Sequence, residues 1–144
     1  MTDRFAYPVD LMDDMDGRVV ATFPDLQGSS TDGADRAEAL AEAADCLEEC
    51  LAECIVDRRD IPPPSPAKGR PVVGPGALIS AKAALYLSMR EAKLTNVALA
   101  KRIGCHEGEV RRLLDPRHAS KIGRLEEALA ALGKRLVVEV RGAA

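Results

Sequence analysis

A proline-rich stretch from Ile61 to Pro75 separates two halves of this 144-residue chain that differ in sequence pattern. It holds six of the nine prolines. Because proline lacks a backbone N–H and has a fixed φ, neither a regular helix nor a central strand passes through such a stretch. Strand-like alternation and one long helical pattern precede it, and several short helical patterns follow it. The chain is therefore predicted to form two domains, residues 1–75 and 76–144, with an extended connector between the two patterns.

The first half predicts a small antiparallel meander. Phe5 to Leu11 alternates apolar and polar residues, as a half-buried strand does. An acidic turn that ends in Asp16-Gly17 leads into a returning strand, Arg18 to Phe23. A third short strand is expected around Ser29 to Thr31, after a second turn.

One helix and one further strand complete the predicted first domain. Asp35 followed by Glu38 has the form of a capping box and opens a run rich in Ala, Leu and Glu that ends near Asp57. The apolar residues of this run fall on one helical stripe, so the helix is expected to lie across the sheet. Val72-Val73 predicts a short fourth strand added to the meander, which gives the order β-β-β-α-β.

Three cysteines, Cys46, Cys50 and Cys54, recur every four residues and so share one face of the predicted helix. Free cysteine is among the most frequently buried residue types, so they are predicted to be buried structural thiols. A zinc site would need a closely spaced cysteine pair and a fourth ligand, which this pattern lacks. No disulfide framework, metal or cofactor is expected.

The second half predicts short helices joined by tight turns, at Ser80 to Lys93, Thr95 to Ile103, Glu107 to Leu114 and Lys121 to Leu132. A β-branched run then predicts a short C-terminal strand that has no partner inside a helical domain. Such a strand is expected to pair with the same strand of a second copy or with the edge of the N-terminal sheet. Dimerisation is accordingly assigned to Leu136, Val137, Val138 and Val140.

The segment from Leu94 to Leu114 has the spacing of a helix-turn-helix. Thr95 is placed to cap a helix with Leu99 on its inner face, Gly104 permits the tight turn, and Val110 anchors the next helix. The pattern resembles the helix-turn-helix of the phage-repressor (Xre/Cro) class, in which the second helix enters the major groove of DNA.

This resemblance implies that the second half contacts DNA. Arginine reads guanine edges and glutamate accepts from cytosine, whereas cations near the helix ends contact phosphates. The predicted DNA-binding residues are Asn96, Lys101, His106, Glu107, Gly108, Glu109, Arg111, Arg112, Arg117, His118 and Lys121. The alternative is a helix-turn-helix that serves only as a structural or protein-binding unit.

The first half carries a second resemblance. Tyr7-Pro8-Val9, the acidic turn to Gly17, the segment Val19 to Gly28 and the helix onset Glu38-Ala39-Leu40 together resemble a HicB antitoxin domain. The likeness covers residues 5 to 55, and the order of this domain and a helix-turn-helix extends it over nearly the whole chain. It implies a degenerate, non-catalytic RNase H-like fold that neutralises a small basic mRNA-cleaving toxin, HicA. Ser29 departs from the pattern, because many members have cysteine there.

The charge distribution fits two partners of opposite charge. Residues 1–66 contain 5 Lys and Arg against 16 Asp and Glu, a net charge of −11, whereas residues 67–144 contain 15 against 7, a net charge of +8; the total is −3. An acidic half attracts a basic toxin, and a basic half attracts nucleic acid. The turn residues Asp13, Asp14 and Asp16 are the candidate toxin contacts. The alternative is two solvated faces that happen to differ in charge.

The sequence thus predicts an α+β, non-enzymatic, cytoplasmic antitoxin that forms a homodimer or higher oligomer, binds a HicA-like toxin and represses its own operon at operator DNA. No apolar run approaches the about 18 to 20 residues that span a bilayer, so no membrane contact is expected. Two alternatives stay open. One is a transcription regulator whose α+β domain senses a small molecule. The other is a nuclease, which needs carboxylates that hold two metal ions; its candidates are Asp10, Asp14, Asp16, Asp25 and Glu42.

Overall fold

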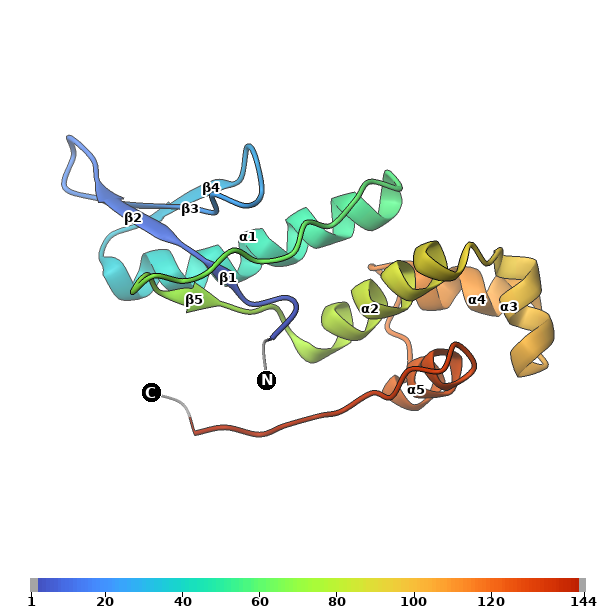
Figure 1. Ribbon diagram of the computed structural model, residues 1–144. Coiled ribbons are helices and arrows are strands. Elements are labelled where there is room, and N and C mark those ends of the chain that lie inside the picture. Colours follow the sequence, from blue (N-terminus) through green and yellow to red (C-terminus); the bar gives the residue numbers. More distant parts are fainter. Residues whose placement is uncertain (1–2, 143–144) are drawn as a thin grey trace. The chain divides into compact units, whose positions relative to one another are not determined.

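The computed structural model describes residues 3–142, which divide after Gly76 into two compact units. We call the part up to Gly76 the sheet unit and the part from Ala77 onward the helical unit. The sheet unit runs from blue to green in Figure 1, and the helical unit runs from yellow-green to red. The predicted α+β class is confirmed.

The sheet unit is built on a three-stranded antiparallel meander. Its strands are β2 (Asp10–Asp13), β3 (Val19–Thr22) and β4 (Ser30–Gly33), paired in that order. Asp10 lies opposite Thr22, and Thr22 lies opposite Ser30. The predicted meander is confirmed, although its first strand begins only at Asp10.

The fourth predicted strand is present but does not join the meander. β5 (Val72–Val73) pairs antiparallel with β1 (Tyr7–Pro8) in a separate two-stranded ladder. The single strand predicted from Phe5 to Leu11 is thus divided at Val9, whose N–H donates to the carbonyl oxygen of Pro71 at 2.9 Å. Pro8, which the alternation places on the polar side, is buried, because β5 covers this part of the chain.

The long helix α1 (Arg36–Val56) begins and ends where the sequence predicts. The Asp35 carboxylate caps it by accepting from the backbone N–H of Glu38 at 2.8 Å. The helix lies along one face of the meander, as Figure 1 shows, and packs against β4 and β3. At the crossing with β4, a Cβ on Gly33 would lie 2.4 Å from the backbone nitrogen of Ala39, so only glycine permits this approach.

The proline-rich stretch is extended, but it is bound to the sheet unit along its length. The Arg4 guanidinium donates to the carbonyl oxygens of Ile61 at 2.8 Å and Pro62 at 3.2 Å. Asp25 accepts from both the backbone N–H and the hydroxyl of Ser65, at 2.9 and 3.0 Å. These bonds fix the part of the stretch before β5, which has no regular structure, and β5 itself pairs with β1, so the stretch is part of the sheet unit and not a free linker.

The helical unit contains α2 (Ala77–Ala92), α3 (Asn96–Ile103), α4 (Glu107–Leu114) and α5 (Ile122–Ala130), all near their predicted positions. Apolar side chains from the four helices meet in one core. Its larger buried members are Leu85, Met89, Leu99, Val110, Leu113, Leu125 and Leu129.

The predicted C-terminal strand, Leu136 to Val140, is not formed in the single chain. A strand needs a neighbour for its N–H and C=O groups, and no strand of the described part of this chain pairs with it. Val137, Val138 and Val140 are 60%, 68% and 93% exposed, whereas Leu136 packs partly on the helical core. The assignment of this segment to a dimer contact stays a prediction.

Candidate functional site

The first candidate site is the outer surface of α3 and α4. Thr95 caps α3 through its hydroxyl, and Gly104, with a φ of 71°, ends the helix in the left-handed conformation. Only three residues then separate α3 from α4. The predicted inner face is confirmed, because Leu99, Val110 and Leu113 are buried in the core.

The structure leaves most of the predicted DNA-binding side chains in solvent. The exposed ones are Lys101, His106, Arg111, Arg112, Arg117, His118 and Lys121. The half-buried ones are Asn96, Glu107, Gly108 and Glu109. Because cations are the larger part of the exposed set, this surface is suited to a polyanion.

The two glutamates of α4 are held by arginines. Glu107 forms an ion pair with Arg111, one turn further along the helix, and this lowers the pKa of Glu107. Glu109 pairs with Arg124 of α5 at 2.5 Å, and its pKa is lowered chiefly by that hydrogen bond. The sequence places Glu109 outward as a base-reading acceptor. In the free protein this carboxylate is bound to Arg124 of α5 and is partly exposed, so its role as a base reader stays a prediction.

Lys82 of α2 is fully buried and holds the end of α4 from inside the unit. Its ammonium donates to the carbonyl oxygens of Arg112 and Leu113, both at 3.0 Å, and to the Ser120 hydroxyl at 2.8 Å. The two carbonyls belong to the last turn of α4, where helical carbonyls lack partners within the helix. Burial lowers the pKa of Lys82, because desolvation disfavours the charged form.

The same network fixes the loop between α4 and α5. Ser120 Oγ lies 2.9 Å from Nδ1 of His118 and 3.3 Å from the carbonyl oxygen of Arg112. This loop also carries Arg117 and Lys121, both predicted to contact phosphate. The buried lysine therefore positions several of the predicted DNA contacts without lying on the surface itself.

Sequence reasoning missed Lys82, because lysine is almost never fully buried and in a helix is assumed to face solvent. One signal was present. Lys82 occupies the same stripe as Ile79, Tyr86 and Met89, at the spacing of a buried helix face, and all four are buried.

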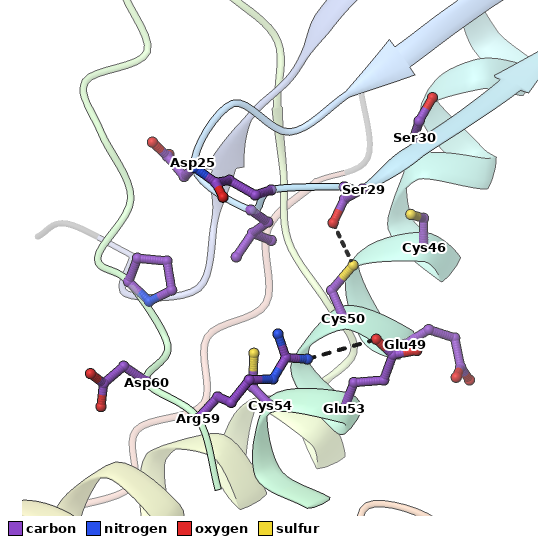
Figure 2. Close-up of a pocket in the computed structure, with 14 residues that line it drawn as sticks. Asp25, Ser29, Ser30, Cys46, Glu49, Cys50, Glu53, Cys54, Arg59 and Asp60 are labelled. Atoms are coloured by element: carbon purple, nitrogen blue, oxygen red, sulfur yellow. Dashed lines mark hydrogen bonds and ion pairs between the residues drawn. The ribbon is translucent and has the colours of Figure 1, made fainter. Parts of the chain in front are cut away.

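The second candidate site is a surface pocket of about 390 Å³ in the sheet unit, between the loop that joins β3 to β4 and the C-terminal half of α1. Figure 2 shows Ser29 pointing toward Cys50, and the Ser29 Oγ and Cys50 Sγ atoms are 2.8 Å apart. Arg59 lies at the lower end of the pocket, 3.9 Å from Glu53.

The cysteine prediction is right only for Cys54, which is buried; Cys46 and Cys50 are partly exposed and line the pocket. The stripe that packs on the sheet is centred on Leu47 and Leu51, one position round the helix from the two exposed thiols. Burial and the neighbouring Cys50 raise the pKa of Cys46 to about 11, so its thiol stays protonated at neutral pH. Protonated thiols are weak nucleophiles and poor metal ligands.

The third candidate is the acidic turn between β2 and β3. Asp14 has a structural role, because its carboxylate accepts from the backbone N–H groups of Asp16 at 2.8 Å and Arg18 at 2.9 Å. Asp13 and Asp16 are exposed, and Met15 at the tip is fully exposed.

Three of the five carboxylates considered for a nuclease have separate partners. Asp10 pairs with Arg70 at 3.4 Å, Asp25 binds Ser65, and Asp14 holds its turn. Among residues 3–142, no group of three or more acidic, histidine or cysteine side chains is arranged to hold a metal ion. Within the same range, no helix is long and apolar enough to cross a membrane.

Comparison with known proteins identifies the family. A family model described as the HicB-like antitoxin of bacterial toxin-antitoxin systems matches residues 6–84, more than half of the chain. The chain belongs to the HicB-like antitoxin family. The resemblance inferred from the strands and turns of the first half is thereby confirmed.

Curated HicB relatives match both units. "Antitoxin HicB 2" of Photorhabdus laumondii subsp. laumondii is 38% identical over 136 residues, which cover 94% of this chain and 96% of the relative. "Antitoxin HicB 1" of the same organism is 32% identical over 93% of this chain and 86% of its own length. "Antitoxin HicB" of Escherichia coli (strain K12) is 32% identical over 90% of this chain and 95% of its own length. Membership in the HicB-like family supports an antitoxin role, with a toxin partner and a non-enzymatic, regulatory function.

Proposed function

We propose that this HicB-like protein binds and inhibits a HicA-like mRNA-cleaving toxin through the sheet unit and represses its own operon through the helical unit. The observation that carries the proposal is the opposite charge of the two compact units. Residues 1–76 contain 7 Lys and Arg against 16 Asp and Glu, whereas residues 77–144 contain 13 against 7, so the net charges are −9 and +6. An RNA-cleaving toxin has to attract RNA and is therefore expected to be basic, so an acidic unit accelerates its capture.

The DNA-binding half of the proposal rests on α3, α4 and the loop that follows. Two helices joined by a three-residue turn, with α4 carrying exposed Arg111 and Arg112, have the arrangement expected of a helix-turn-helix with a recognition helix. Arg111 and Arg112 are the residues proposed to read base edges, and Lys101, Arg117 and Lys121 are proposed to bind phosphates.

Operator binding of this kind requires two copies of the helical unit. A single helix-turn-helix reads one half-site, and two half-sites lie about 34 Å apart. The exposed segment Leu136 to Val140 is proposed as the dimer contact, because pairing with a second copy would supply the ladder partner that the single chain lacks.

Co-expression with the neighbouring short reading frame tests the toxin half. The full-length chain should suppress the toxicity of a basic product of that frame and should co-purify with it. Toxicity that persists at a matched level of folded full-length chain would refute the inhibition.

Gel-shift titration on the upstream region tests the DNA half. Arg111→Ala and Arg112→Ala should each weaken operator binding, by about 1 to 3 kcal/mol where a bidentate base contact is lost. Arg135→Ala, an exposed residue beyond α5, is the matched control and should leave affinity nearly unchanged. Unchanged affinity in both α4 variants would move the DNA-binding surface elsewhere.

The pocket beside α1 is the observation that favours the second candidate, a transcription regulator that senses a small molecule. Its volume, about 390 Å³, is within the usual range for small-ligand sites. Under that alternative, a ligand would shift the DNA affinity of the purified chain and no toxin partner would co-purify.

A further inference from the structure

The two faces of the β2–β3–β4 sheet differ in what covers them. Side chains opposite one another in an antiparallel pair point to the same face, and successive residues alternate. Ala21 and Gly33 point toward α1, because Ala21 is fully buried and a Cβ on Gly33 would collide with the α1 backbone. Within the sheet unit, α1 is the helix that packs closely against these strands. No described helix or strand of the sheet unit packs on the opposite face.

The strand register defines the uncovered face. Its two rows across the sheet are Asp10–Thr22–Ser30 and Met12–Val20–Asp32. We call these six residues the Met12 face. Asp10, Met12, Ser30 and Asp32 are exposed, and Val20 and Thr22 are half-buried. A sheet face normally buries one apolar row against another layer, and here Met12 and Val20 lack that layer.

Within the described sheet unit, the most exposed large apolar side chains lie in this hairpin. Met12 is 72% exposed, and Met15, in the turn of the same hairpin, is fully exposed. Methionine is flexible and polarizable, so it adapts to the surface of a partner. Single exposed apolar residues need no explanation. Two large ones in one hairpin, of which Met12 lies opposite the partly exposed Val20, supply an apolar centre of the kind found in protein interfaces.

The rim of this apolar centre is acidic. Asp10 and Asp32 lie on the Met12 face, and Asp13, Asp14 and Asp16 lie at the hairpin end. Two arginines offset part of this charge: Arg70 pairs with Asp10 at 3.4 Å, and Arg18 pairs with Asp32 at 2.7 Å. The rim keeps a net charge of about −3, and complementary charge is what steers a basic partner to a surface.

We infer that the Met12 face and the Met15 turn are the docking surface for the toxin, which presents an apolar centre surrounded by Lys or Arg. This inference rests on the proposed inhibition of the toxin and names the surface of this chain at which the toxin binds. The pocket beside α1 is the weaker candidate. Its lining includes Arg59, and none of its lining residues is a large exposed apolar side chain. Interfaces draw most of their affinity from a few buried anchors, and the Met12 face supplies such anchors.

Substitutions at Met12 in the full-length chain test the inference. Met12→Glu removes the apolar anchor and adds a negative charge that attracts a basic partner, whereas Met12→Lys removes the anchor and adds repulsion. Position 12 tolerates either charge in the free protein, because the Met12 side chain is mostly in solvent. We expect Met12→Glu to weaken toxin binding at least tenfold and Met12→Lys to weaken it further, with the same rank order in the toxicity assay.

Val56→Lys is the matched control, because Val56 belongs to the same unit and is 62% exposed at the end of α1. It should retain wild-type affinity for the toxin. Glu53→Lys probes the rim of the pocket beside α1 in the same way. Circular dichroism and thermal melting establish that each variant is folded before its affinity is measured.

The outcomes distinguish an error in the docking surface from an error in the proposed inhibition of the toxin. Loss of binding in the Met12 variants with retention in Val56→Lys and Glu53→Lys supports the inference. Wild-type binding in Met12→Lys overturns the inference. A loss of binding confined to Glu53→Lys also overturns it and places the interface at the pocket beside α1. A wild-type chain that neither binds nor neutralises the toxin refutes the proposed inhibition itself.

Discussion

The surfaces proposed for the two partners are supported in different ways by their units. In the sheet unit, the Met12 face is carried by three paired strands, and their ladder holds the side chains in register. In the helical unit, the end of α4 and the following loop are held by one buried side chain, Lys82. A surface held by a backbone ladder tolerates side-chain changes, whereas a surface held by one internal group depends on that group. A single substitution of a buried side chain should therefore disturb the proposed surface of the helical unit more than that of the sheet unit.

The largest effect is expected at Lys82. In Lys82→Ala, two carbonyls of α4 and the Ser120 hydroxyl lose their donor, and the buried stem leaves a cavity, so the free energy of unfolding of the helical unit should fall by about 3 to 5 kcal/mol. Hydrogen exchange should report the loss at α4 amides and leave the sheet unit protected.

Lys101→Ala is the matched control, because that lysine is exposed on α3; it should change stability by no more than about 0.5 kcal/mol. A loss below about 1 kcal/mol in Lys82→Ala would contradict the view that this network holds α4, given the usual net value of a single hydrogen bond.

The corresponding weak point of the sheet unit is backbone contact at Gly33. A Cβ there would lie 2.4 Å from the Ala39 nitrogen, so Gly33→Ala has to push α1 away from β4. The free energy of unfolding should fall by about 1 to 3 kcal/mol in denaturant titration, the usual range for overpacking. Gly123→Ala is the control, because nothing lies within 4 Å of that Cβ in α5, and it should stabilise the protein by up to about 1 kcal/mol. If the two substitutions changed the free energy of unfolding equally, the close approach of α1 to β4 would not explain the loss in Gly33→Ala.

The helices and the meander follow from the sequence because their signals are local. Asp35 and Thr95 mark helix starts, Gly104 marks a helix end, and apolar periodicity marks the buried faces. The division of the first strand at Val9 was not predictable, because it depends on pairing with Val72 and Val73, more than sixty positions later in the chain. Periodicity within one segment carries no information about which distant segment covers it.

For the candidate DNA-binding surface, the sequence predicted which side chains are exposed better than it predicted their contacts. Exposure of Arg111 and Arg112 follows from the helix period, and the structure agrees with it. The ion pair of Glu109 with Arg124 and the hydrogen bonds of Lys82 to α4 join neighbouring helices, so no local pattern contains these contacts. The uncovered sheet face likewise becomes visible only once the register and the position of α1 are known.

A smaller effect is expected at the helix caps, where the two units should behave alike. Asp35 accepts from the Glu38 N–H at 2.8 Å in the sheet unit, and Thr95 accepts from the Ala98 N–H at 3.1 Å in the helical unit. Asp35→Ala and Thr95→Ala should each lower stability by about 1 kcal/mol, since each leaves one first-turn donor without its partner. Thermal melting measures both, and a much larger loss at either site would mean that its cap also supports tertiary packing.

The smallest effect is the pH dependence that Lys82 imposes on the helical unit. Burial lowers its pKa in the folded chain, whereas in the unfolded chain the lysine titrates near its ordinary value of 10.5. Between the two values the unfolded state binds more protons than the folded state, so the free energy of unfolding rises with pH through that window. Lys82→Met keeps the apolar stem and removes the titrating group, so the stability of wild type relative to Lys82→Met should increase as pH approaches 10.5. Leu85→Met, a buried change on the same helix, should show no such trend, and a wild-type advantage that stays flat or falls with pH would contradict the burial of a charged Lys82.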